Sequence, residues 1–134
     1  MPEGVKLIIP KGTVLRFDSS VGLIARGPVL INGTMDEPVI LRGRGSEDSS
    51  SSWQGVFIFN TEEASVWSDT FVLNTAGISL EDWNLSAGVT FYQAEVALKN
   101  VSFFGNLCED ALNIVHSDFR LEHVHIKNTL SDGL

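Results

Sequence analysis

The sequence contains a single cysteine, Cys108, so an internal disulfide bond is excluded and cysteine usage indicates no particular compartment. Basic residues are also scarce: nine Lys and Arg stand against 17 Asp and Glu, which gives a net charge of −8. This acidic balance disfavours nucleic acid or an anionic membrane as a partner. No apolar run approaches the roughly 18 residues of a membrane span, so we expect no membrane insertion. Residues 1–10 are too short and wrongly charged for a signal peptide.

The most informative feature that is present is a 23-residue repeat in the last third of the chain. Residues 88–110 align with residues 111–132, and equivalent apolar residues are 23 apart. The aligned pairs are Val89 and Leu112, Val96 and Phe119, Leu98 and Leu121, Val101 and Val124, and Phe103 and Ile126. A fixed period of this length predicts a solenoid.

Each repeat contains three apolar pairs whose members are two residues apart, as in Leu112 and Ile114. This spacing places both side chains on one face of a strand. Turn-forming residues separate the pairs, so three strands and three corners would form one coil, with coils stacked roughly 4.8 Å apart. The pattern of a leucine-rich repeat is absent. We therefore predict an all-β chain, in which residues 1–134 form one single-stranded parallel β-helix domain of about five coils and three short sheets.

The repeat also predicts one continuous core, in which stacking of the coils buries each apolar residue against its equivalent. The members of this core are Val96, Leu98, Val101, Phe103, Leu112, Ile114, Phe119, Leu121, Val124 and Ile126. Outside the core, residues 43–53 are rich in glycine and serine and are predicted to form an exposed loop.

An earlier coil aligns with this repeat at a longer spacing of 33 residues. The aligned pairs are Val56 and Val89, Val66 and Val96, Phe71 and Val101, and Leu73 and Phe103. In this alignment three extra residues lie near 61–63 and seven lie within 77–87, which we predict to be an inserted corner with room for a helical turn. Because Trp67 alternates with Val66 in this alignment, we expect Trp67 to face outward.

Six segments follow one another in a distinctive order: residues 10–17 (Pro-Lys-Gly-Thr-Val-Leu-Arg-Phe), 22–27, 33–41, 53–55 (Trp-Gln-Gly), 101–106 and 109–113. In this order they resemble bacterial right-handed parallel β-helix repeat proteins of the pectin-lyase-like superfold. The resemblance implies a right-handed helix and an exported or cell-surface location, whereas the lack of a signal peptide favours a cytoplasmic one. It implies no activity, because the superfold includes lyases, hydrolases, adhesins and inert stalks.

The acidic residues with the best spacing for a site are Glu109 and Asp110, together with Asp132 one coil later. Asp110 and Asp132 occupy equivalent corners, so their Cα atoms should lie about one strand spacing apart. Two carboxylates at that distance could bind Ca²⁺, or could share a proton as a catalytic acid/base pair. An Asp at a corner also commonly caps the turn by accepting backbone N–H hydrogen bonds. We favour this structural role, which needs no cofactor.

A second candidate site combines aromatic and acidic side chains, namely Trp67, Glu81, Asp82 and Trp83. Aromatic rings beside carboxylates are typical of a carbohydrate-binding groove, so carbohydrate is a candidate ligand. No Lys or Arg recurs at the coil spacing, which argues against a pectate-lyase mechanism, since that chemistry needs a cation to stabilise an enolate.

Two classes of function therefore remain open. The first is a non-enzymatic structural or binding β-helix module, as a fragment or small relative of a larger surface protein. The alternative is a carbohydrate-binding protein or a carbohydrate-active enzyme. The C-terminal coil has an apolar interior and no evident cap, so we expect self-association through the open end of the β-helix. A two-fold dimer is the simplest product.

Overall fold

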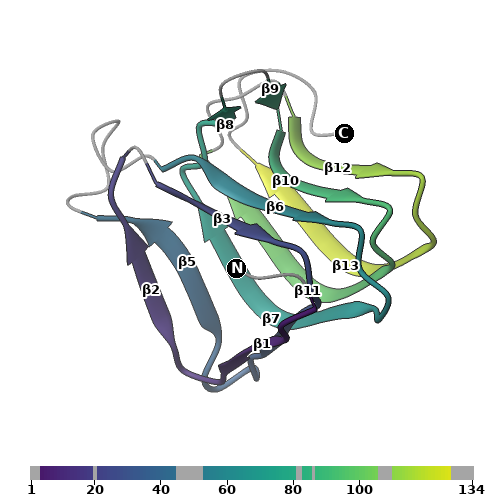
Figure 1. Ribbon diagram of the computed structural model, residues 1–134. Coiled ribbons are helices and arrows are strands. Elements are labelled where there is room, and N and C mark those ends of the chain that lie inside the picture. The colour runs from purple at the N-terminus through teal and green to yellow at the C-terminus, as the bar shows by residue number, and fades with distance from the viewer. Residues whose placement is uncertain are drawn as a thin grey trace.

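The computed structural model describes residues 4–19, 21–44, 53–80, 83–85, 87–105 and 110–127. Within these residues the chain is all-β, and its strands form two parallel sheets and one antiparallel hairpin (Figure 1). The large sheet contains β1 (Leu7–Pro10), β2 (Val14–Phe17), β4 (Val29–Asn32), β5 (Val39–Gly43), β7 (Ser65–Leu73), β11 (Val96–Phe104) and β13 (Phe119–Lys127). The small sheet contains β3 (Gly22–Ala25), β6 (Gly55–Phe59), β10 (Ala87–Tyr92) and β12 (Asp110–Val115). The hairpin consists of β8 (Ile78–Leu80) and β9 (Trp83–Leu85).

The 23-residue repeat sets the pairing of the later strands. In the large sheet β11 pairs with β13, and in the small sheet β10 pairs with β12, both in parallel. All five predicted residue pairs are confirmed by this register, including Val96 with Phe119 and Val89 with Leu112. The colours in Figure 1 run in the same order across both sheets, so successive repeats stack side by side. This all-β arrangement of parallel sheets is compatible with a β-helix solenoid.

A residue with positive φ bends each long strand of the large sheet at an equivalent position. These residues are Asp69, Asn100 and His123, with φ values of 46°, 55° and 53°. Asn, Asp and His adopt this left-handed conformation more readily than most residues. Upstream, β4 and β5 are separate strands that pair with the two halves of β7. Because β7, β11 and β13 continue through the bend, the second and third strands expected in each coil belong to one hydrogen-bonded sheet.

The core lies between the inner faces of the two sheets. Among the predicted core residues, those on β11 and at the start of β12 are buried, namely Val96, Leu98, Val101, Phe103 and Leu112. The residues nearest the end of the stack are half-buried and pack against this core, namely Ile114, Leu121, Val124 and Ile126. The prediction that Phe119 is buried is wrong, because its side chain is 60% exposed. Within the described residues no strand pairs with the far side of β13, so nothing there covers Phe119.

The insertion at residues 77–87 forms a β-hairpin in its described residues, and these contain no helical turn. Its first strand, β8, contacts β6 of the small sheet.

Most of the loop predicted at residues 43–53 lies outside the described residues. Of its described residues, Gly43 and Trp53 are buried, and Arg44 is exposed as predicted. The Trp53 ring stacks on Phe17 at a centroid distance of 4.3 Å, and its Nε1–H donates a 2.7 Å hydrogen bond to the Leu73 carbonyl oxygen.

Position in the stack predicts how much each apolar residue contributes to stability. Leu98 and Leu121 occupy equivalent positions, but Leu98 is buried between two strands whereas Leu121 lies on the last described strand. We expect Leu98→Ala to lower the free energy of unfolding by about 3–5 kcal/mol and Leu121→Ala by about 2 kcal/mol, because the cost grows with the cavity left behind. Urea denaturation of both variants measures the difference. Equal effects would show that the end of the stack is covered in solution.

Candidate functional site

The carbohydrate site predicted from the sequence depends on an outward-facing Trp67, and this expectation is wrong. The Trp67 side chain is 0% exposed, whereas its neighbour Val66 is 47% exposed. The indole projects between the sheets, where it meets Phe91 of β10 edge-on at a centroid distance of 5.5 Å. Its Nε1–H donates a 3.1 Å hydrogen bond to the Val29 carbonyl oxygen. Trp67 therefore stabilises the core and cannot offer its ring to a sugar.

The error arises from a register slip of one residue. The strand pairing matches Ser65 with Val96 and Trp67 with Leu98, so the first insertion contains two extra residues rather than three. A slip of one residue moves every side chain of a strand to the opposite face. The sequence signal for the correct register is the residue type at the bend. The correct alignment places Asp69 opposite Asn100, and Asp and Asn both adopt the positive φ that the bend requires more readily than most residues.

The predicted acidic site is only partly within the described residues. Asp110 begins β12, where it is half-buried and pairs with Ala87 of β10. Its proposed partners, Glu109 and Asp132, lie outside the described residues. Within the described part of the chain, no three His, Cys, Asp or Glu residues gather closely enough to hold a metal ion. The Ca²⁺ and acid/base hypotheses therefore gain no support from the described geometry.

The remaining predicted ligand-binding residues belong to the inserted hairpin. Trp83 is the first residue of β9, and its backbone pairs with Leu80. Glu81 and Asp82, which join the two strands, lie outside the described residues. The structure therefore places the first strand of the hairpin against β6, and of the four predicted ligand-binding side chains it describes only that of Trp67, which is internal.

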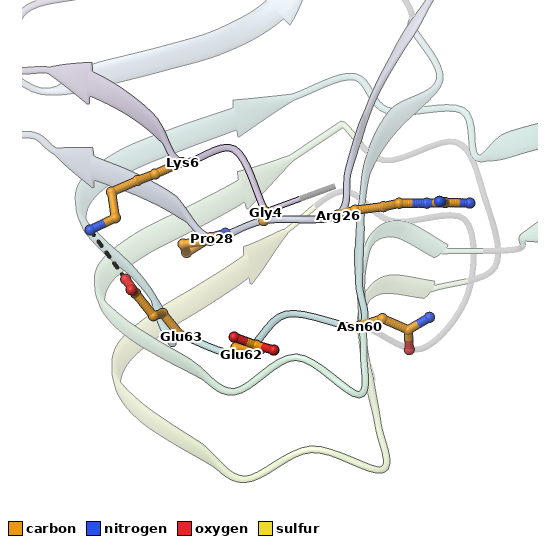
Figure 2. Close-up of a pocket in the computed structure, with 8 residues that line it drawn as sticks. Gly4, Lys6, Arg26, Pro28, Asn60, Glu62 and Glu63 are labelled. Carbon is orange, nitrogen blue, oxygen red and sulfur yellow. Dashed lines mark ion pairs between the residues drawn. The ribbon is translucent and has the colours of Figure 1, made fainter. Parts of the chain in front are cut away.

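A charged depression of about 230 Å³ lies where three corner segments meet (Figure 2). Lys6 precedes β1, Arg26 follows β3, and residues 60–64 join β6 to β7. The Lys6 ammonium is 3.1 Å from a Glu63 carboxylate oxygen, and Figure 2 shows this ion pair at one side of the depression. Arg26 points away from Lys6, and its guanidinium lies 5.2 Å from the centre of the Phe59 ring. The lining residues provide no nucleophile with an adjacent base, so this geometry supports polar contacts rather than catalysis.

The most distinctive surface is the outer side of β12 and β13, which we name the C-terminal edge. In the large sheet it presents the Phe119 side chain beside a second depression of about 320 Å³. Glu95, Asp118 and Arg120 also line this depression. An apolar ring is thus exposed next to charged groups at an edge where no described strand is paired. Unpaired strand edges of this kind are templates for association with another chain.

Comparisons of the chain with protein-family models, curated proteins and solved structures gave no match. Within the described residues there is also no helix that is long and apolar enough to cross a membrane.

Proposed function

We propose that this chain is a non-enzymatic structural or binding module that associates with itself through the C-terminal edge. Its architecture in this proposal is a right-handed, single-stranded parallel β-helix of about five coils, with about 23 residues in each regular coil and three faces. Parallel pairing of residues 23 apart in both sheets supports the solenoid. The bend at Asp69, Asn100 and His123 supports the assignment of the large sheet to two of the three proposed faces.

The exposure of Phe119 is the observation that carries this proposal. Phe119 occupies the same inner position on β13 that Val96 occupies on β11, yet Phe119 is 60% exposed and Val96 is 2% exposed. Removing apolar surface from water is favourable by about 25 cal/mol per Å², and this gain must exceed the entropy that two copies lose on association. A further strand laid against β13 would cover Phe119 in the way that β13 helps to cover Val96.

The structural roles of the tryptophans also support a non-enzymatic module. Trp67 fills the space between the sheets, and Trp53 stacks on Phe17 and bonds to the Leu73 carbonyl. The alternative, a carbohydrate-binding protein or carbohydrate-active enzyme, was based on Trp67, Glu81, Asp82 and Trp83, of which only Trp67 has a described side chain, and that side chain is buried. No contact among the described residues now favours that alternative.

We expect Phe119→Glu to abolish self-association, because the substitution places a charge in the surface that would be buried. Light scattering of the wild-type chain over a dilution series in the micromolar range should give a mass above that of the 14.6 kDa monomer. The Phe119→Glu variant should remain monomeric throughout the series.

Val66→Glu is the matched control, because it adds the same charge to an exposed apolar position on the outer face of β7. This control should associate like the wild type. A wild-type chain that stays monomeric at every concentration, or a Phe119→Glu variant that associates normally, would contradict the proposed function.

A further inference from the structure

We infer that the second copy binds the C-terminal edge with its own N-terminal edge, so that copies join head to tail. The N-terminal edge is defined here as the outer sides of β1, β2 and β3, which are the first strands at the opposite end of the two sheets. This inference rests on the proposed self-association and adds the identity of the partner surface.

The inner apolar positions of the two edges belong to the same rows. One row of the large sheet runs through Ile9, Ile31, Trp67, Leu98 and Leu121. Another runs through Leu15, Leu41, Val72, Phe103 and Ile126. The rows of the small sheet begin at Leu23 and Ala25 and end at Leu112 and Ile114. Each of these four rows begins and ends with an apolar residue, so a head-to-tail contact would continue all four without a polar interruption.

The same register brings the exposed Phe119 against a suitable neighbour. Leu7 lies two residues before Ile9, and Phe119 lies two residues before Leu121, so they would meet across the contact. Leu7 is half-buried and packs against the core of its own copy. Phe119, which no described strand covers, would then be buried against an aliphatic side chain.

The two edges also carry opposite net charge. Residues 4–26 contain four cations against one anion, namely Lys6, Lys11, Arg16, Arg26 and Asp18. Residues 110–127 contain three carboxylates against two cations, namely Asp110, Asp118, Glu122, Arg120 and Lys127. A basic edge attracts an acidic one, whereas two N-terminal edges repel each other. The register places Lys6, which also pairs with Glu63 of its own copy, beside Asp118 of the next copy, which favours the contact. It places Arg16 beside Lys127, which offsets part of the gain.

A two-fold dimer of C-terminal edges does not have this complementarity. A two-fold axis reverses the strand direction in the second copy. Strands that are not equivalent would then meet at the contact, so the apolar rows of one copy would not continue into the other. Head-to-tail contact instead keeps every strand parallel and above its equivalent. A head-to-tail assembly of any size keeps one free edge at each end, so further copies can add to it. The mass should therefore keep rising with concentration.

Mixing two edge variants tests this inference. Phe119→Glu blocks the C-terminal edge and leaves the N-terminal edge intact, whereas Leu7→Glu blocks the N-terminal edge and leaves Phe119 intact. Each variant alone should be monomeric by light scattering, and an equimolar mixture should form a one-to-one heterodimer through the two intact edges. Circular dichroism melts confirm that both variants are folded before they are mixed.

A charge exchange provides a second test that does not alter the core. Lys6→Glu and Asp118→Lys should each weaken association several-fold, and the double variant should recover it, because Lys6 and Asp118 would meet across the contact. Since Lys6→Glu also removes the ion pair with Glu63 of the same copy, the recovery in the double variant is the decisive measurement. This test remains informative if Leu7→Glu fails to fold. The attraction should also weaken as salt is added.

Three outcomes distinguish this inference from the proposed function on which it rests. A Leu7→Glu variant that still dimerises alone would overturn head-to-tail contact and leave self-association in place. If the charge exchange does not restore association, the proposed pairing of Lys6 with Asp118 between copies is wrong. A wild-type chain that is monomeric throughout would overturn both the inference and the proposed function.

Discussion

Replacing Trp67 with alanine is expected to lower the free energy of unfolding by about 3–5 kcal/mol, the range for truncating a large aromatic residue in a core. The indole is fully buried between the two sheets and packs edge-on against Phe91 of the small sheet. The substitution removes these contacts and leaves a cavity that β7 and β10 can only partly close. It also removes the hydrogen bond from Nε1–H to the Val29 carbonyl oxygen.

The neighbouring substitution Val66→Ala is the control, and it should change the free energy of unfolding by less than about 0.5 kcal/mol. Val66 faces outward and loses little contact when it is truncated. Urea denaturation with a shared slope for the two variants measures both values. If Val66→Ala costs more than Trp67→Ala, the side chains of β7 face the opposite way and the alignment that places Trp67 outside is correct.

Much of the fold could be predicted because the repeat is regular where no residues are inserted. The 23-residue spacing predicted the pairing of β10 and β11 with β12 and β13, including the pair of Val101 with Val124. The pairing of Val56 with Val89 was also predicted correctly across the insertions. Apolar periodicity is sufficient in these cases because one face of each strand is buried, which specifies the register.

The sequence was insufficient where an insertion made the register ambiguous. Val66 and Trp67 are both large and apolar, so hydrophobicity alone could not decide which of them faces the core. The structure favours Trp67, because an inward indole fills the space between the sheets and its N–H finds the Val29 carbonyl. The same mistake made Trp67 appear to be a ligand-binding residue, so the error in the candidate site follows from the error in the fold.

The exposure of Phe119 illustrates a second limit of sequence reasoning. The repeat assigns Phe119 to the core, since its equivalent Val96 is buried. Burial also depends on having a strand on each side, and periodicity gives no information about what covers the last strand. For this reason the site with the strongest case for function, the C-terminal edge, contains a residue that the repeat alone assigns to the interior.

Replacing Gly55 with alanine should lower the free energy of unfolding by about 2–5 kcal/mol, through backbone strain and overpacking together. Gly55 begins β6 with a φ of 111°, a conformation that residues with a side chain rarely adopt. A Cβ atom at this position would lie 2.0 Å from the carbonyl oxygen of Gly88 in the adjacent strand β10. Because that oxygen belongs to the backbone, β6 and β10 would have to separate to relieve the clash.

Gly12→Ala separates the two contributions, because Gly12 also has a positive φ, 76°, but a Cβ there would come no closer than 3.7 Å to the Glu37 side chain. This control should cost about 1–2 kcal/mol, the penalty for a left-handed conformation alone. Denaturant unfolding compares the two alanine variants directly. Equal costs would mean that β10 does not approach β6 closely at Gly88, and that contact between neighbouring repeats is looser than the pairing of Val56 with Val89 requires.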